Sequence, residues 1–335
     1  MDNGGISSLP PLVFDPILVA KPWGGRRLAG FDKHLPDEGT FGESWEVADL
    51  PPSSVTSSPV SRVTVRGGPL HGATLRELIG RFGVDFLGSA EPTPDGDFPL
   101  LVKLLDAREH LSVQVHPTAG YAAEHPGVWL KTESWYVVDA DPGSVLFKGF
   151  WPGVGPQDVA AAAGTPAIVN LLRAWPAHAG DFHHLPAGVV HALGAGVFVA
   201  EHQTPSDTTF RLYDWIDTYP RPPRRLHLEE ALETLAFDEP SAPLPAVSEI
   251  RSRRTLIDSA YYWLREHTGT TGDRSGFGDE QLRILTVVEG EIILRWDGHD
   301  RAVSRGATAV IPSCAARLVE FEMVGRTIVL EAGLV

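Results

Sequence analysis

The sequence predicts a mostly β protein made of two barrel-like domains with a few short helices. Three observations support this fold class. Short runs rich in Val, Ile, Leu, Phe and Trp recur along the 335 residues. The 34 glycines and 28 prolines separate these runs, as turns separate the short strands of sandwiches and barrels. One motif, described below, also occurs in each half of the chain.

The strand-like runs far outnumber the helical ones. They are HLSVQVHP (110–117), SWYVVDA (134–140), GVFVAEHQ (196–203), TFRLYDW (209–215), LRILTVV (282–288), EIILRW (291–296) and TIVLEA (327–332). Helical periodicity is confined to residues 74–88, 156–164 and 226–237. The helices are therefore expected to decorate a β framework.

A proline-rich segment divides the chain. Residues 237–247 (FDEPSAPLPAV) carry three prolines and show neither the helical nor the strand period. We expect an interdomain linker there. The prediction is a first domain over residues 1–240, which carries the helical decoration, and a second domain over residues 248–335.

Composition limits the classes of partner. The chain has 28 Lys and Arg against 43 Asp and Glu, a formal charge of −15, which disfavours nucleic-acid and anionic membrane partners. The single cysteine, Cys314, excludes an internal disulfide and fits a reducing compartment. The first residues lack a signal-peptide pattern, and no apolar run could span a bilayer. We expect a cytoplasmic protein.

The repeated motif is a glycine, a proline six positions later, and a third residue five positions after that. In the first half it is Gly180, Pro186 and His191, the spacing of the second cupin motif, in which a strand ends in a tight turn that returns a histidine into a barrel. In the second half, residues 306–317 repeat the spacing with Arg317 at the histidine position. The pattern suggests a duplicated cupin in which only the first copy kept a metal site.

Strand geometry groups four candidate metal ligands. Alternate residues of a strand share a face, so Ser112, Gln114 and His116 point to one side of their strand. The same rule places Glu133 with Lys131 and Trp135, and places His191 with Val189 and Leu193. Two imidazoles, one carboxylate and one amide oxygen inside a barrel would suit zinc or another divalent first-row metal.

Other histidines have a weaker case. His183 and His184 are adjacent, so they face opposite sides of their strand and at most one can face a pocket. We expect both to lie outside the ligand set. His202 and His227 have no comparable context, and we expect structural roles for them.

Longer segments resemble one family. They are 22–25 (PWGG), 42–47 (GESWEV), 98–117 (FPLLVKLLDAREHLSVQVHP), 130–140 (LKTESWYVVDA), 180–215 and 224–232. In order, spacing and residue type, residues 10–240 resemble a type I phosphomannose isomerase of the short bacterial form. The last ninety or so residues resemble it only as a degenerate cupin.

This resemblance implies a fold, a cofactor and an activity. The fold is two cupin (jelly-roll) barrels. The cofactor is one zinc per chain, held by Gln114, His116, Glu133 and His191. The activity is interconversion of mannose 6-phosphate and fructose 6-phosphate through a cis-enediol. We expect a sugar phosphate as the small-molecule partner, and a monomer or weak homodimer.

An aldose–ketose shift needs a proton carrier, an electrophile and a phosphate anchor, and the sequence offers candidates for each. We expect Arg211, Lys131 and Glu201 to be catalytic and Lys103, Ser112 and Trp23 to bind substrate. Alternatives stay open for several of them: Lys131 could be the base or a surface residue, Arg211 could pair with Asp214 or Glu201, and Glu201 could form a surface salt bridge. Ser112 could be a buried hydroxyl bonded to backbone, and Trp23 and Glu43 could be structural.

Three rival functions remain at this point. His183, His184 and His202 depart from the family pattern, which would fit an isomerase of a different sugar phosphate. Histidine and glutamate ligands also accept iron, as in cupin dioxygenases. A non-catalytic sugar-binding cupin is the third possibility, although it would be expected to lose ligands in both copies.

Overall fold

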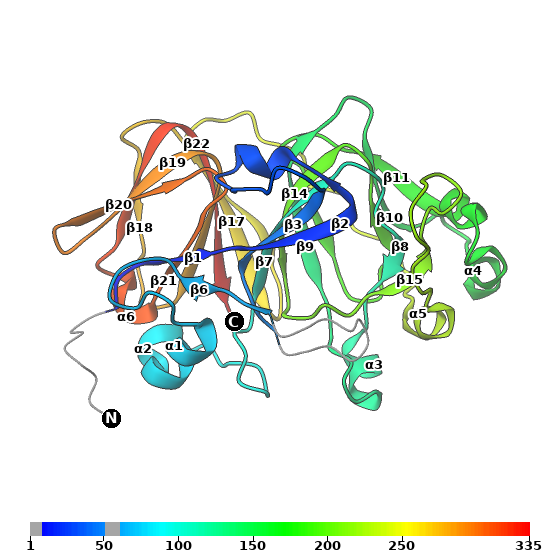
Figure 1. Ribbon diagram of the computed structural model, residues 1–335, viewed down its shortest axis with the longest axis horizontal. Coiled ribbons are helices and arrows are strands. Elements are labelled where there is room, and N and C mark those ends of the chain that lie inside the picture. The colour runs from blue at the N-terminus through cyan, green and yellow to red at the C-terminus, as the bar shows by residue number, and fades with distance from the viewer. Residues whose placement is uncertain (1–8, 51–60) are drawn as a thin grey trace.

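The structure is a computed structural model that describes residues 9–50 and 61–335, and it consists of two packed β domains (Figure 1). The first domain is drawn mainly in green and the second in orange and red. Blue N-terminal strands run between them: β1 (Leu12–Asp15) pairs with a strand of the second domain, and β2 (Ile17–Gly25) pairs within the first. The expectation of a mostly β fold is confirmed.

Two sheets form the first domain. The six-stranded sheet contains, in order, β12 (Phe182–Leu185), β9 (Glu133–Ala140), β14 (Val197–Gln203), β7 (Leu101–Ala107), β2 and β3 (Phe41–Val47). The five-stranded sheet contains, in order, β11 (Leu172–Pro176), β10 (Val145–Phe150), β13 (His191–Leu193), β8 (Val113–Val115) and β15 (Phe210–Tyr213). The candidate ligands lie on or next to strands of both sheets.

The second domain is one nine-stranded sheet. Its order is β16 (Arg253–Asp258), β17 (Tyr262–Gly269), β22 (Glu320–Leu334), β19 (Arg283–Trp296), β21 (Thr308–Ile311), β1 and β6 (Thr64–Val65), with β18 (Arg274–Gly276) on β22 and β20 (His299–Ser304) on β19. The short pair β4 (Asp49–Leu50) and β5 (Ser61–Arg62) lies apart.

Two runs that the sequence separates are a single strand. LRILTVV and EIILRW both lie in β19, where Gly290 adopts a positive φ of 73°. The register against β22 shifts on each side of Glu289, so the glycine marks a bulge rather than a turn. A bulge keeps the strand continuous, which is why this turn signal misled the sequence analysis.

The three expected helical segments are confirmed. They are α1 (Leu75–Phe82) with α2 (Val84–Leu87), α4 (Pro156–Ala162) and α5 (Leu228–Thr234). A capping box between Thr74 and Glu77 begins α1, and Pro156 occupies the first turn of α4. The short helices α3 (Ala119–Glu124), α6 (Ser313–Ala316), η1 (Arg27–Gly30) and η2 (Pro166–Leu171) were not predicted. None of the described helices is both long and apolar enough to cross a lipid bilayer.

The two copies of the repeated motif begin alike and end differently. Gly180 and Gly306 have φ values of 91° and 87°, a conformation that favours glycine. After Gly180 the chain follows β12, turns, and returns along β13, which carries His191 into the domain. After Gly306 it follows β21 into α6, and Arg317 ends on the surface, where its side chain is 61% exposed and pairs with Glu280.

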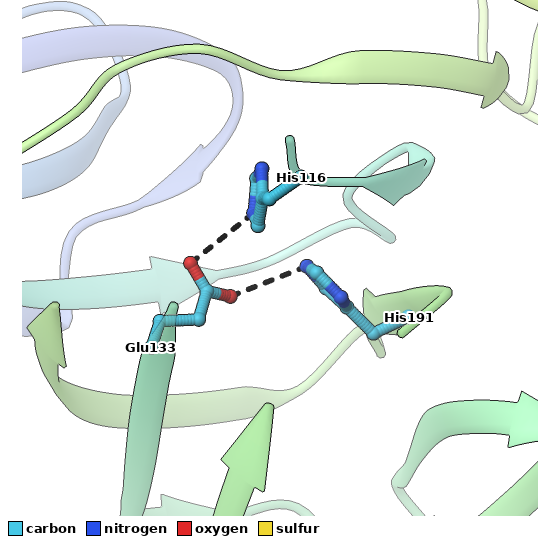
Figure 2. A group of neighbouring side chains, drawn as sticks. All are labelled: His116, Glu133 and His191. Atoms are coloured by element: carbon cyan, nitrogen blue, oxygen red, sulfur yellow. Dashed lines mark ion pairs between the residues drawn. The ribbon is translucent and has the colours of Figure 1, made fainter. Parts of the chain in front are cut away.

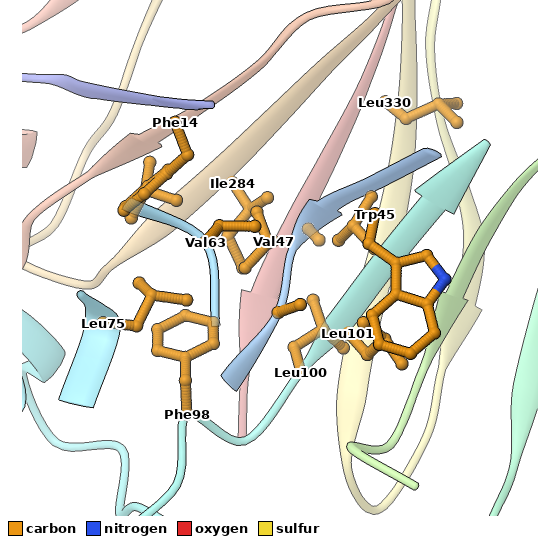
Figure 3. Close-up of a cluster of buried hydrophobic side chains, with 14 of the residues drawn as sticks. Phe14, Trp45, Val47, Val63, Leu75, Phe98, Leu100, Leu101, Ile284 and Leu330 are labelled. Carbon is orange, nitrogen blue, oxygen red and sulfur yellow. The ribbon is translucent and has the colours of Figure 1, made fainter. Parts of the chain in front are cut away.

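The largest buried apolar cluster is shared by both domains. Phe14, Trp45 and Phe98 pack in the same cluster as Ile284 and Leu330 of the second domain (Figure 3). Each large apolar side chain that is fully buried contributes about 1.5–3 kcal/mol. The division into domains 1–240 and 248–335 remains a prediction, and residues 237–247 form no helix or strand beyond a bridge from Leu244 to Phe182.

Candidate metal centre and active site

Three side chains meet inside the first domain. His116 Nε2 lies 3.2 Å from Glu133 Oε2, and His191 Nε2 lies 3.2 Å from Glu133 Oε1 (Figure 2). The three ligand atoms all lie within 4.8 Å of one another. All three residues are buried, so this His–Glu–His triad is shielded from bulk water.

Strand pairing explains why these residues meet. His191 on β13 lies directly opposite Gln114 on β8, and His116 follows β8 by one residue. Glu133 begins β9 in the facing sheet. The period of two therefore turns all of them inward, as the sequence analysis expected.

Each histidine is oriented by a backbone carbonyl. His116 Nδ1 lies 2.9 Å from the carbonyl oxygen of Thr208, and His191 Nδ1 lies 2.9 Å from that of Val189. A carbonyl can only accept, so both Nδ1 atoms carry the proton and donate. The Nε2 atom of each ring faces Glu133, the arrangement typical of metal-bound histidines.

The triad fits a metal ion because three of its polar atoms lack a hydrogen bond in the described part of the chain, although Lys131 Nζ lies 2.9 Å from Glu133 Oε2. His116 Nε2 and both carboxylate oxygens of Glu133 are buried without a hydrogen bond among the described residues, which is costly for buried polar groups. The two 3.2 Å contacts do not have hydrogen-bond geometry. Two imidazole nitrogens and a carboxylate match the ligands of zinc and similar divalent ions.

The charge states of these groups are also those of metal ligands. Burial and the nearby Lys131 ammonium lower the pKa of His116 to about 3, so its imidazole is neutral. Burial opposes ionisation of Glu133, yet Lys131, whose Nζ lies 2.9 Å from Oε2, and the two histidines hold its pKa well below the ordinary value. Metals bind the deprotonated forms of both groups.

Gln114 lies beside the triad. Its Nε2 is 3.4 Å from His191 Nε2, while its Oε1 accepts a 2.9 Å hydrogen bond from Ser112 Oγ. A 180° rotation of the carboxamide would turn Oε1 toward the triad. Ser112 could then accept from Nε2, because a hydroxyl can donate or accept.

The remaining sequence-predicted site residues line one pocket beside the triad. Trp23, Lys103, Lys131, Glu201 and Arg211 line it together with Ser112 and Gln114. Glu43, for which the sequence analysis considered a structural role, lines the same pocket. The sequence analysis missed Lys21, Asp207, Thr209 and Arg224, which also line the pocket. Lys21 lies two residues from Trp23 on the same strand face, so the strand period of two could have placed it in the pocket. Arg224 lies outside any strand or helix and gave no such signal.

Lys103 is held between two carboxylates. Its Nζ lies 3.4 Å from Glu201 Oε1 and 3.8 Å from Glu43 Oε2. Burial alone would lower the pKa of Lys103, but these two carboxylates raise it, so the side chain is an ammonium. Glu43 also accepts from Trp45 Nε1 and pairs with Lys21, and its pKa is about 2 despite burial.

The two carboxylate oxygens of Glu201 differ in their hydrogen bonds. Trp135 Nε1 donates to Oε2 at 2.8 Å, whereas Oε1 has no hydrogen bond among the described residues. Burial and the Glu133 charge raise the pKa of Glu201. A carboxylate with a raised pKa at a pocket wall suits proton transfer, and this buried position excludes the surface salt bridge.

Arg211 does not form the structural ion pair with Asp214 that the sequence analysis left open. Asp214, one of the partners considered for it, instead accepts from Arg221 and Arg224. Arg211 Nε has no hydrogen-bond partner in the described part of the chain. Burial and the Arg224 charge lower the pKa of Arg211, which an incoming anion would reverse.

The other histidines lie outside the triad. His183 is buried on the inward face next to Trp135, and His184 Nδ1 contacts Ser134 Oγ on the outward face. His202 is buried at the junction of the domains, and His227 accepts from the backbone N–H of Arg211. His183 and His184 face opposite sides of β12, as predicted for adjacent residues of a strand.

A larger cavity, of about 470 Å³, lies between the two domains, away from the triad. Among its lining residues, the carboxylate of Glu266 is bonded by Tyr136 and Arg254, and Arg326 pairs with Glu289. Glu266, Arg326 and Glu289 are thus paired within the protein. The smaller pocket at the triad has the unpaired polar atoms that a ligand requires.

A buried His–Glu–His triad inside a β domain of two sheets, beside a pocket that is lined by cations and carboxylates, defines a metal-binding cupin. Comparison with known proteins narrows this class. A model of the phosphomannose isomerase type I catalytic domain matches residues 16–142. The chain belongs to the type I phosphomannose isomerase family.

Individual relatives agree. The chain is 34% identical over 259 residues to a mannose-6-phosphate isomerase of Streptococcus mutans, which covers 75% of this chain and 77% of the relative. It is 33% identical over 294 residues to the mannose-6-phosphate isomerase ManA of Bacillus subtilis, covering 84% and 86%. The crystal structure of the mannose 6-phosphate isomerase from Bacillus subtilis is similar with a TM-score of 0.82 and 26% identity, over 97% of this chain and 99% of that one.

Proposed function

We propose that this chain is a zinc-dependent isomerase that interconverts mannose 6-phosphate and fructose 6-phosphate through a cis-enediol. The observation that carries the proposal is the buried His–Glu–His triad beside a pocket that is lined by Lys103, Arg211 and Glu201. Membership of the family favours this activity over a cupin dioxygenase or a non-catalytic sugar-binding protein.

The proposed metal site holds one zinc ion per chain. His116, Glu133 and His191 supply three ligands, and Gln114 supplies a carboxamide oxygen after the rotation described above. When bound there, zinc supplies a Lewis acid for the oxygens at C1 and C2 of the sugar. Lys131, 2.9 Å from Glu133, balances the charge of the only acidic ligand in this set.

Glu201 is the proposed proton carrier. Its Oε1, which has no hydrogen bond among the described residues and lies 3.4 Å from Lys103 Nζ, takes the proton from C2 of the aldose and returns it to C1 of the enediol, and the reverse reaction uses the same atom. The Trp135 hydrogen bond to Oε2 fixes the direction of the carboxylate. Lys131 remains the alternative base from the sequence analysis, and its contact with Glu133 favours a supporting role.

The phosphate anchor is proposed at Arg211, whose planar guanidinium can bind two phosphate oxygens. Lys103 adds a second positive charge, and Ser112 adds a hydroxyl on the same wall. Trp23, buried at the pocket wall, limits the space for the sugar. The choice of mannose 6-phosphate over another aldose phosphate is part of the proposal.

Three further expectations join this proposal. The two cupin domains divide at residues 240–248, with β1 and β6 crossing into the sheet of the second domain. The protein works in the cytoplasm, in keeping with its single cysteine. It acts as a monomer or weak homodimer, as expected from the sequence.

The test is conversion of mannose 6-phosphate to fructose 6-phosphate by purified protein before chelation, after chelation, and after zinc is added back. We expect turnover that disappears with the chelator and returns with zinc, while circular dichroism shows a folded protein throughout. Iron(II) added in place of zinc, with oxygen consumption recorded, tests the dioxygenase. Absence of turnover in folded, zinc-loaded protein would exclude mannose 6-phosphate, and other aldose phosphates would then be assayed.

A further inference from the structure

A hydroxyl of the second domain reaches the strands that carry the acidic site residues. Tyr262 begins β17 and is fully buried. Its hydroxyl donates to the carbonyl oxygen of His202 at 2.9 Å and lies 2.9 Å from Ser134 Oγ. Ser134 on β9 and His202 on β14 are directly paired, so one phenol group joins two neighbouring strands of the first domain.

The same two strands present Glu133 and Glu201 on their other face. Glu133 directly precedes Ser134, and Glu201 directly precedes His202. Successive residues of a strand point to opposite faces. The outward face is therefore fixed by Tyr262, and the inward face carries the metal ligand and the proposed proton carrier.

The hydrogen bonds around Tyr262 have one consistent direction. The single hydroxyl proton of Tyr262 goes to the carbonyl of His202, so the phenol oxygen accepts from Ser134 Oγ. Ser134 Oγ in turn accepts from His184 Nδ1, 3.0 Å away on β12. Removal of the Tyr262 hydroxyl leaves both Ser134 Oγ–H and the His202 carbonyl without this partner.

We propose that Tyr262 is a positioning residue through which the second domain holds Glu133 and Glu201 at the correct separation. This inference rests on the proposed function, in which Glu133 binds the metal and Glu201 moves the proton. It gives the second domain a part in the reaction beyond packing. Tyr262 itself touches neither the metal ligands' side chains nor the pocket lining given above.

The experiment compares Tyr262→Phe with Tyr136→Phe. Tyr136 also crosses the domain junction, where its hydroxyl donates to Glu266 Oε1 at 2.6 Å, and Glu266 keeps Arg254 as a partner when that bond is lost. Both variants lose one hydroxyl and keep the ring. Cobalt(II) replaces zinc as the probe, with affinity from chelator competition and the visible absorption of the bound ion as readouts, beside kcat and KM.

We expect Tyr262→Phe to weaken cobalt binding about tenfold, the lower end of what outer hydrogen-bond partners of metal ligands contribute. We also expect a changed absorption band and a kcat that falls more than KM changes. Tyr136→Phe should stay within about twofold of the wild type in each of these, by comparison with that range. All assays run well below the lowest melting temperature of the set, so that stability differences do not enter.

Each result that differs from these expectations rules out one specific claim. If Tyr262→Phe matches Tyr136→Phe in affinity, absorption and kcat, Tyr262 is only structural. If Tyr262→Phe fails to fold, Ser134→Ala removes the hydrogen bond between Tyr262 and β9 and keeps the one to the His202 carbonyl, and unchanged cobalt binding in that variant rejects the positioning of Glu133 by Tyr262. A folded wild type that binds no cobalt would overturn the proposed function itself, and the positioning role with it.

Discussion

Both domains bury a glutamate beside a histidine, yet the surroundings of the two carboxylates differ. In the second domain, Glu331 Oε2 contacts His267 Nε2 at 2.6 Å, and Oε1 accepts from Arg283 Nε at 3.1 Å. Arg253 adds a contact at 3.2 Å. In the first domain, neither oxygen of Glu133 has a hydrogen bond among the described residues, and its close contacts are Lys131 Nζ at 2.9 Å and the two histidines at 3.2 Å.

This difference separates an ion cluster from a metal site. The Glu331 cluster satisfies itself with two arginines and a histidine, so a cation would have to displace them. In the Glu133 triad, the Nε2 atoms of two histidines face the carboxylate, Lys131 is its cationic neighbour, and a metal ion held by all three residues would complete the site. A histidine next to a buried glutamate is therefore weak evidence for a metal, and the accounting of hydrogen bonds decides between the two interpretations.

The largest expected effect comes from Glu133→Gln. The amide keeps the shape but removes the anionic ligand, so zinc binding should be lost and turnover of mannose 6-phosphate should fall at least about a thousandfold, since the metal supplies several kcal/mol to the transition state. Metal content by mass spectrometry and the isomerase assay measure this. Full zinc occupancy in Glu133→Gln would place the metal elsewhere.

Glu331→Gln is the counterpart in the second domain. Loss of the carboxylate leaves Arg283 and His267 without their buried partner, which we expect to lower the free energy of unfolding by about 3–4 kcal/mol. Zinc content and kcat of the folded fraction should be unchanged. Urea denaturation followed by tryptophan fluorescence checks stability, and a loss of zinc here would contradict the distinction between the clusters.

The pH dependence of stability sharpens the same comparison. Burial opposes ionisation of Glu331, but His267, Arg253 and Arg283 hold its pKa below the ordinary 4.5. A carboxylate with a lowered pKa stabilises the fold fully above pH 4.5 and loses that contribution as the pH falls further. The stability difference between wild type and Glu331→Gln should thus be constant at neutral pH and shrink below pH 4.5. A stability difference between wild type and Glu331→Gln that grows as the pH falls would contradict the predicted direction of this dependence.

The smallest effect is expected at Arg317, which occupies the position of His191 in the second copy of the motif. Its side chain is largely exposed and 3.5 Å from the exposed Glu280. Arg317→Ala should change the free energy of unfolding by less than about 0.5 kcal/mol and leave turnover unchanged. His191→Ala, made alongside, should lose zinc. A loss of activity in Arg317→Ala would show that the second motif still contributes to the site.

The sequence was sufficient for the parts of this comparison that depend on local pattern. Strand period alone turned Gln114, His116, Glu133 and His191 to one interior, because a side chain's face is fixed by its position along the strand. The three helical segments with clear periodicity were also predictable. The family resemblance added the identity of the metal and the substrate, which local pattern does not contain.

Contacts between distant segments were not predictable in this way. The pairing of β1 with β21 joins Leu12 to Val310, and no local signal specifies that register. The same holds for the Glu331 cluster, which draws on β16, β17, β19 and β22, and for Tyr262 at the domain junction. Arg224 reaches the pocket from a loop, where neither period applies. Such contacts follow from how the domains pack.

The central claim is that one metal binds per chain, at the triad of the first domain. The most direct measurement is the zinc-to-protein ratio of the wild type and of His116→Ala after dialysis against trace zinc, by mass spectrometry. We expect a ratio near one for the wild type and near zero for His116→Ala, with circular dichroism showing both folded. A ratio near two, or a metal retained by His116→Ala, would contradict it.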